Sequence, residues 1–218
     1  EGRGSRIRLN CPDSLHANPV PIDDMCVMAV SRFACPELSA SFWERACLAN
    51  PHGLGLMWFE GGEVRHKTTL LYDADTVQAW LRAVPEGTQR AVHLREATRG
   101  SRCVKNAHPH VHEAPGLTVA LMHNGSLPFL PAQEHEGSSD SALLLREWLL
   151  PRLCDKYSSA VAFSACWRRA LQELESAWPQ KNRLVLLNHL GEWDFLGMHE
   201  GFWKGGTWVS NPRAAAWL

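Results

Sequence analysis

The sequence predicts an α+β domain in which helices and sheets pack in layers. The predicted strands and helices are mixed along the chain, but they do not alternate as in a doubly wound sheet. Several predicted strand pairs are joined by loops of hairpin size. The chain has 218 residues, of which 45% are hydrophobic, so one domain of this length can bury a core without a disulfide or a metal.

The charges of the chain are balanced, with 22 Lys and Arg against 23 Asp and Glu and a formal net charge of -1 at pH 7. Scattered, balanced charge offers no basic footprint for a phosphate backbone, so we expect no nucleic acid partner. The apolar stretches are far shorter than the ~18 residues of a membrane span. Residues 1–25 also lack the pattern of a secretory signal. We therefore expect a cytoplasmic protein with no membrane partner.

Seven cysteines are scattered through apolar surroundings, without a Cys-x-x-Cys pair. An odd number with no such pair argues against the disulfide framework of a secreted protein. We expect most of these residues to be reduced and buried as small hydrophobic side chains. A functional cysteine must then be identified by its position in the chain.

Residues 1–25 differ in character from the rest of the chain. They are polar, carry Pro12, Pro19 and Pro21, and show neither helical nor strand periodicity, which indicates an extension outside the fold. The segment is interpreted as a propeptide, a cloning remnant or upstream read-through. At Cys26 the sequence becomes apolar. The run 26–30 predicts a buried strand at the start of a domain that extends over residues 26–218.

A helix and a hairpin follow the first strand. Ser39 or Ser41 can cap the helix, because a hydroxyl there can accept a hydrogen bond from a free backbone N–H of the first turn. Two apolar segments, 54–59 and 64–69, flank the tetrapeptide Glu-Gly-Gly-Glu at 60–63. This pattern predicts two strands joined by a tight turn.

The middle of the chain predicts a second helix and two further strands. Asp73 or Asp75 can cap the helix. Its apolar residues recur at the i, i+3, i+4 and i+7 spacing of one helical face, and they are Val77, Trp80, Leu81 and Val84. Strands are predicted at 91–95 and 117–123.

The last part of the chain predicts two helices and three strands. The first helix runs from Ser139 through Trp148, and Pro151 should end or kink it, because proline lacks the N–H that the helix needs. The second helix covers 160–178. The strands are predicted at 184–188, 195–199 and 207–209.

Four segments carry reactive or charged side chains where a predicted strand ends or a helix begins. They are Cys26, 93–100, 123–125 and 138–141. Side chains and backbone N–H groups at such ends are free to contact a ligand. Each segment alone also has an ordinary structural interpretation, since Asn-Gly is a common turn and Asp140 a common helix cap.

The order of these segments resembles the class II glutamine amidotransferases, which are N-terminal-nucleophile hydrolases, and particularly the stand-alone amidotransferases of bacteria and their viruses. The resemblance spans most of residues 26–211. It includes Asn-Pro-His-Gly-Leu-Gly at 50–55, where the family usually has Asp in place of His52. The other matching segments are Cys26, His-x-Arg-x-Ala-Thr-x-Gly at 93–100, Asn-x-His-Pro at 106–109, His-Asn-Gly at 123–125 and Ser-Asp-Ser at 139–141.

The resemblance implies a four-layer αββα sandwich and makes residues 26–218 a glutamine amidotransferase type 2 domain. It implies that Cys26 is the nucleophile and that its own α-amino group is the base. An α-amine with a pKa near ~8 suits that task at neutral pH. The tetrahedral oxyanion needs two donors, which the resemblance assigns to the Asn124 side chain and the Gly125 N–H. It implies neither a cofactor nor a metal.

The resemblance also assigns residues to the two charged ends of glutamine. Arg95 can pair with the α-carboxylate through its planar fork, and Asp140 carries the opposite charge for the α-ammonium. His123 belongs to the same substrate-binding set. Thr98 and Gly100 are expected to shape the loop that covers the site.

The expected reaction is hydrolysis of glutamine through a Cys26 thioester, with ammonia passed to an acceptor enzyme on a separate chain. It requires a free α-amine on Cys26. An alternative is a γ-glutamyl amide hydrolase acting on a larger conjugate, and another is a catalytically silent pseudo-enzyme that binds a partner. A third is a zinc module on His108, His110 and His112, which would share one face of a strand; Pro109 and loop-like surroundings argue against that strand.

Overall fold

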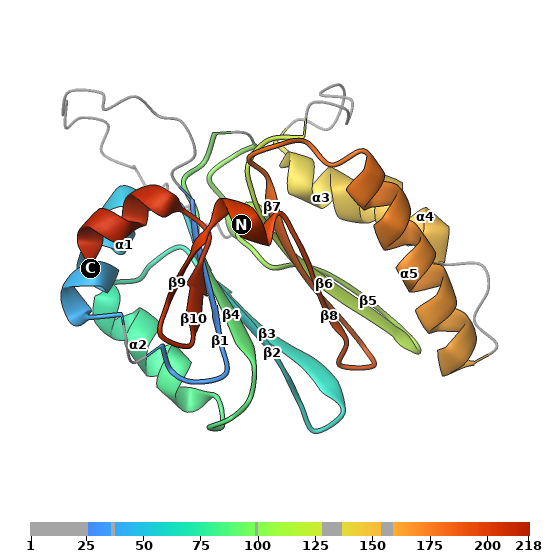
Figure 1. Ribbon diagram of the computed structural model, residues 1–218, viewed down its shortest axis with the longest axis horizontal. Helices are drawn as coiled ribbons and strands as arrows, with labels where there is room; N and C mark the ends of the chain where they lie inside the picture. The colour runs from blue at the N-terminus through green and yellow to red at the C-terminus, as the bar shows by residue number, and fades with distance from the viewer. Residues whose placement is uncertain (1–25, 36–37, 99, 128–136, 154–158) are drawn as a thin grey trace, which may run out of the picture.

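The computed structural model describes residues 26–35, 38–98, 100–127, 137–153 and 159–218. These residues form four layers, with two sheets face to face between two layers of helices (Figure 1). The predicted αββα sandwich is therefore confirmed. The extension predicted at 1–25 lies outside the described residues. The helices are α1 (Ala40–Ala49), α2 (Ala74–Ala83), α3 (Asp140–Leu143), α4 (Leu150–Leu153) and α5 (Ala160–Ser176).

The six-stranded sheet has the strand order β3-β2-β4-β1-β10-β9, and all neighbouring strands are antiparallel. Its strands are β1 (Val27–Ser31), β2 (Leu54–Glu60), β3 (Glu63–Thr69), β4 (Arg90–Leu94), β9 (Phe202–Lys204) and β10 (Thr207–Val209). The four-stranded sheet has the antiparallel order β5-β6-β7-β8. Its strands are β5 (His110–Ala114), β6 (Leu117–Asn124), β7 (Arg183–Asn188) and β8 (Trp193–Leu196).

Side-chain alternation along the strands divides the core into three apolar clusters, one between each pair of neighbouring layers. On β1, Val27 and Ala29 pack in the cluster shared with α1 and α2, whereas Met28 and Val30 face the other sheet. Strands β6 and β7 alternate in the same way between the α5 layer and the facing sheet. Because both faces of each sheet are covered, the central strands are continuous apolar runs in the sequence.

The helix starts predicted from capping residues are confirmed, and the structure decides between the alternatives. Ser39, rather than Ser41, caps α1 by accepting from the backbone N–H of Phe42. Asp73, rather than Asp75, caps α2 by accepting from Thr76. Each side chain satisfies one of the backbone donors that the first helical turn leaves free.

The helix predicted to end or kink at Pro151 continues past it. The segment η2 (Leu144–Leu149) is a π helix, and α4 carries the chain through Pro151 to Leu153. Proline cannot donate to the preceding turn, and a π turn is a common way for a helix to accommodate such a break in its hydrogen bonding. The irregularity therefore precedes Pro151, and the helix does not end there.

One predicted strand has other bounds, and one strand forms beside a proline that argued against it. The strand predicted at 195–199 is β8 (Trp193–Leu196), which ends just before Gly197, where φ is 73°, and a 3₁₀ turn over Met198–Glu200 follows. Strand β5 (His110–Ala114) begins directly after Pro109. A proline just before a strand removes no hydrogen bond from the ladder, so Pro109 did not exclude a strand there.

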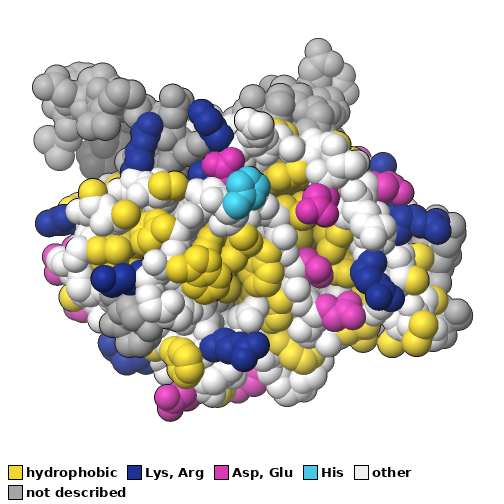
Figure 2. Space-filling view, in the orientation of Figure 1, with side chains coloured by type: hydrophobic (Ala, Val, Ile, Leu, Met, Phe, Trp, Pro, Cys, Tyr) yellow, Lys and Arg dark blue, Asp and Glu magenta, His cyan; other side chains and the backbone are white. Residues whose placement is uncertain are grey.

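Among the described residues, five cysteines are free thiols, but only Cys35 is buried; the other four are half-buried, which differs from the prediction. None of the helices in the described segments is both long enough and apolar enough to cross a membrane. On the face shown in Figure 2, Lys and Arg side chains are scattered among Asp and Glu.

The C-terminal end of α2 is held against β4 by Arg90, whose side chain is 1% exposed. Its guanidinium donates to the carbonyls of Leu81 and, at 3.1 Å, of Val84. It also donates to the carbonyl of Pro85 at 2.8 Å. The last carbonyls of a helix have no partner within the helix, so Arg90 satisfies groups that would otherwise be buried and unpaired.

We predict that Arg90→Met lowers the free energy of unfolding by about 3 kcal/mol or more, because it leaves the buried carbonyls of Leu81 and Val84 without this donor. Urea unfolding measures the change. Arg82→Met, on the exposed side of α2 where Arg82 donates to Gln78, is the matched control and should change stability by less than about 0.5 kcal/mol. Equal effects of the two substitutions would contradict the role of Arg90.

Candidate active site

The start of β1 and the ends of β4, β6 and β10 meet at one end of the two stacked sheets. Val27 pairs with Leu94 across β1 and β4, so Cys26 lies opposite Arg95. Strand alternation directs both side chains toward the facing sheet, on the same side as Met28. From that sheet, the last residue of β6, Asn124, reaches Cys26: its Nδ2 donates to the Cys26 carbonyl at 2.6 Å.

The thiol of Cys26 contacts the backbone of Glu96. The Glu96 N–H donates to Sγ at 3.3 Å, and Sγ lies 3.3 Å from the Glu96 carbonyl. Burial raises the pKa of the Cys26 thiol to about 11, although the Glu96 N–H and the charge of Arg95 act to lower it. The sulfur is therefore protonated at neutral pH, and it needs a base before it can act as a nucleophile.

Ser210 joins the three strands that meet at Cys26. Its hydroxyl accepts from the Met28 N–H at 2.8 Å and from Asn124 Nδ2 at 3.0 Å. Its own N–H donates to the Met28 carbonyl at 2.9 Å. Ser210 thus fixes the amide of Asn124 beside β1. Sequence reasoning gave it no role beyond the end of the family resemblance.

Gly125 follows Asn124 with a φ of 135°, a conformation that residues with side chains rarely adopt. A Cβ at this position would lie 2.2 Å from Asn182 Oδ1 and 3.1 Å from the Asn182 Cα. Only glycine fits here without moving the neighbouring chain. The turn after β6 therefore leaves the Gly125 backbone closely packed against Asn182.

Arg95 is 3% exposed, and its neighbours hold it in place. Its N–H donates to the Gly53 carbonyl at 2.7 Å, which continues the pairing of β4 with β2. Its Nη1 donates to the Ser101 carbonyl at 3.1 Å. The charge of Arg95 acts to lower the pKa of the Cys26 thiol, whereas the charges of Glu96 and Asp140 act to raise it. One cation and two anions therefore act on the same thiol.

His52 occupies the position where the family usually has Asp. Burial lowers the pKa of His52, which favours the neutral ring. Its Nδ1 accepts from the Ala97 N–H at 3.0 Å. The imidazole therefore supplies the acceptor that a carboxylate could offer at this position, and it holds the segment after Arg95.

Asp140 begins α3, and both of its carboxylate oxygens accept backbone hydrogen bonds. Oδ2 accepts from the Leu127 N–H at 3.0 Å, and Oδ1 accepts from the Ser141 N–H at 2.9 Å. The first bond joins the helix to the segment that follows Gly125. The same helix end is packed under Gly100, where a Cβ would lie 2.9 Å from the Ser139 backbone nitrogen.

The remaining predicted residues lie at different depths. Thr98 and Gly100 are exposed on the loop after β4. His123 is 2% exposed, and strand alternation directs it away from Cys26, toward the helix layer. There Nδ1 lies 3.0 Å from Ser141 Oγ and Nε2 lies 2.8 Å from Asn182 Oδ1.

Three buried histidines pack side by side next to the site. The ring centroids of His93 and His108 are 4.1 Å apart, and those of His108 and His110 are 4.7 Å apart. Burial lowers the pKa of His93 to about 3 and that of His110 to about 4, and it holds the pKa of His108 well below its ordinary value. The three rings are therefore neutral at physiological pH.

The alternative zinc module on His108, His110 and His112 is not supported. No group of three His, Cys, Asp or Glu in the described segments is arranged to hold a metal ion. His110 Nε2 instead pairs with Ser139 Oγ at 2.9 Å, and the half-exposed His112 does not join the ring stack.

Two facing sheets between helical layers, with a cysteine at the start of a central strand, form the architecture of the N-terminal-nucleophile hydrolases. A solved structure described as the allosteric regulatory enzyme of purine biosynthesis has the same fold. It superposes with a TM-score of 0.55 over 88% of this chain and 43% of that chain, at 15% identity. A predicted glutamine amidotransferase from Pseudomonas aeruginosa PA01 aligns with a TM-score of 0.45 at 18% identity, over 84% of this chain and 78% of that chain.

Sequence comparison identifies the family. The model of the class II glutamine amidotransferases matches residues 25–199. A protein of Haemophilus influenzae named "Putative glutamine amidotransferase" is 28% identical over 167 residues, which cover 70% of this chain and 54% of the relative. The chain thus spans about half the length of that curated relative. It belongs to the class II glutamine amidotransferases.

The buried histidines predict a pH dependence of stability. In the unfolded chain each of them binds a proton below about pH 6.5, whereas in the folded protein they stay neutral. The unfolded state then binds more protons, so stability is complete above pH 6.5. For each buried histidine, the free energy of unfolding falls by about 1.4 kcal/mol per pH unit as the pH drops toward 4.

We predict that His108→Phe makes the loss of stability between pH 7 and pH 5 shallower by about 1 kcal/mol per pH unit. Urea unfolding at several pH values measures both slopes. His199→Gln is the control, because His199 is exposed and lies outside the stack. If the wild type and His108→Phe have the same slope, the buried ring does not act as a neutral group.

Proposed function

We propose that this protein hydrolyses the side-chain amide of glutamine at Cys26 and releases ammonia. The observation that carries the proposal is the convergence of charges on one thiol: Arg95 lies opposite Cys26 across two paired strands, and the charges of Glu96 and Asp140 act on the same thiol. Glutamine is a primary amide with a carboxylate and an ammonium at its other end, so these charges complement it. Membership of the class II family supports the same substrate.

The thiol needs a base, because burial raises its pKa to about 11. Within the described part of the chain, only the Glu96 backbone lies within hydrogen-bond distance of Sγ. We therefore assign the α-amine of Cys26 as the base, since it is covalently held beside the thiol. The assignment requires a form of the protein in which Cys26 is the first residue. The family match supports a domain that starts near this position, because it begins at residue 25.

The reaction balances with these groups alone. Sγ attacks the side-chain carbonyl carbon of glutamine while its proton passes to the α-amine. The C–N bond then breaks, and ammonia leaves with that proton. Water hydrolyses the γ-glutamyl thioester, releases glutamate and restores the thiol.

We assign Asn124 Nδ2 and the Gly125 N–H as the donors to the tetrahedral oxyanion. The Asn124 amide already donates to the Cys26 carbonyl at 2.6 Å, so it lies next to the atom that would carry the intermediate. Donors that are held in place before the reaction do not have to reorganise as charge develops.

We predict that Cys26→Ala abolishes ammonia release from glutamine, because Cys26 carries the thiol that lies opposite Arg95 and next to Asn124. A coupled glutamate dehydrogenase assay measures the product. Cys166→Ala is the control, because Cys166 lies on α5 in the outer helical layer, and it should keep full activity. Activity in Cys26→Ala would overturn the assignment of the nucleophile.

We predict that substitutions of the binding and oxyanion residues separate in their kinetics. Asn124→Ala should lower kcat roughly 100-fold or more, the usual cost of one oxyanion donor. Arg95→Ala and Asp140→Asn should mainly raise KM, because they contact the ends of the substrate in both ground and transition states. A KM effect in Asn124→Ala together with kcat effects in Arg95→Ala and Asp140→Asn would contradict these assignments. A panel of γ-glutamyl amides tests the alternative, since a conjugate hydrolase would prefer a larger substrate to glutamine.

A further inference from the structure

Asn182 is a buried residue just before β7, and both ends of its side-chain amide are hydrogen-bonded. It is 4% exposed. Oδ1 lies 2.8 Å from His123 Nε2, and Nδ2 donates to the Gln180 carbonyl at 3.2 Å. Rotating the amide by 180° would place its oxygen against a carbonyl oxygen and its NH₂ against His123. The contacts therefore fix which end faces His123.

The fixed amide determines the tautomer of His123. An amide oxygen only accepts, so Nε2 of His123 must carry the proton. In the neutral ring, Nδ1 is then an acceptor, and Ser141 Oγ, at 3.0 Å, donates to it. The His123 ring is thus held by Asn182 at Nε2 and by Ser141 at Nδ1.

The same side chain also packs against Gly125. A Cβ on Gly125 would lie 2.2 Å from Asn182 Oδ1, so the two residues are in direct contact. Asn182 therefore contacts the residues on both sides of Asn124. Asn124 itself pairs with Arg183, the residue that follows Asn182.

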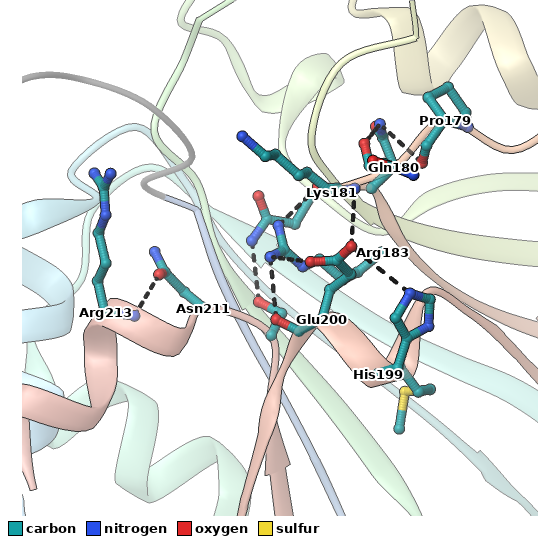
Figure 3. Close-up of polar contacts among 12 residues, drawn as sticks. Pro179, Gln180, Lys181, Arg183, His199, Glu200, Asn211 and Arg213 are labelled. Atoms are coloured by element: carbon teal, nitrogen blue, oxygen red, sulfur yellow. Dashed lines mark hydrogen bonds and ion pairs between the residues drawn. The ribbon is translucent and has the colours of Figure 1, made fainter.

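Hydrogen bonds from neighbouring residues hold the backbone around Asn182 in place. Figure 3 shows Lys181, Arg183 and His199 gathered around Glu200. Arg183, which is 4% exposed, donates to the Lys181 carbonyl at 2.7 Å and to the Glu200 carbonyl at 3.1 Å. The Asn182 carbonyl accepts from Trp178 Nε1 at 3.0 Å. A residue braced in this way can impose its geometry on its neighbours.

We infer that Asn182 is a positioning residue for the oxyanion donors: it fixes the tautomer of His123 and seats Gly125, and so holds Asn124 and the Gly125 N–H in place. The inference rests on the proposed function for its kinetic consequence, but the tautomer is a property of the protein alone. In this inference Asn182 acts only through His123 and Gly125, which it contacts directly. Its effect should therefore fall on kcat and leave glutamine binding unchanged.

The kinetic test uses Asn182→Ala in the form of the protein that releases ammonia. We expect kcat to fall roughly 10- to 100-fold, the cost of misplacing catalytic groups by a fraction of an ångström, while KM for glutamine stays within about 2-fold. Asn182→Asp keeps the acceptor for His123 and should recover part of kcat. Asn188→Ala is the matched control, because Asn188 is also a buried Asn, at the other end of β7, but bonds to Glu192. It should leave kcat unchanged even where it lowers stability.

The second test needs no activity. Nitrogen-15 NMR of histidine-labelled protein should show His123 as the Nε2–H tautomer in the wild type and a loss of that preference in Asn182→Ala. An Nδ1–H tautomer in the wild type, or unchanged kcat in a folded Asn182→Ala, would overturn the inference. If the wild type releases no ammonia, the proposed function fails, and the NMR result still decides the role of Asn182 at His123.

Discussion

The pairing of β1 in the middle of the six-stranded sheet is the constraint on which the site depends. Its register with β4 sets Cys26 opposite Arg95, and its contact with β10 brings Ser210 to Met28. The facing sheet then delivers Asn124 to the Cys26 carbonyl. A shift of one residue in β1 would direct Cys26 toward the helices and separate these groups.

Burial shapes the chemistry as strongly as geometry does. The same low polarity that raises the pKa of the Cys26 thiol to about 11 lowers the pKa of His93 to about 3. Neutral histidines can pack between the sheets, whereas a protonated thiol at the same depth is not a nucleophile. In the proposed mechanism the α-amine, held covalently beside the sulfur, removes the thiol proton without a histidine or carboxylate acting as the base.

Local sequence patterns predicted the elements with strong periodicity, such as β1, α2 and the hairpin of β2 and β3. They were less accurate where neighbouring residues set the backbone conformation. Strand β5 forms directly after Pro109, and the strand predicted at 195–199 ends before Gly197, which has a positive φ. Cys26, Arg95, Asn124 and Asp140 were named from a family resemblance, and the structure brings them together. The contacts of Ser210 and Asn182 could not be predicted, because their partners lie 182 and 59 residues away in the sequence.

We propose that the free α-amine of Cys26 activates its thiol toward glutamine. The rate of covalent labelling by a glutamine analogue that carries a diazoketone in place of the side-chain amide, followed by peptide mass mapping, tests this activation. We expect one adduct, on Cys26, in the chain that begins at Cys26, and little labelling in the chain that retains residues 1–25. Equal labelling rates in the two chains, or an adduct on another cysteine, would contradict the account.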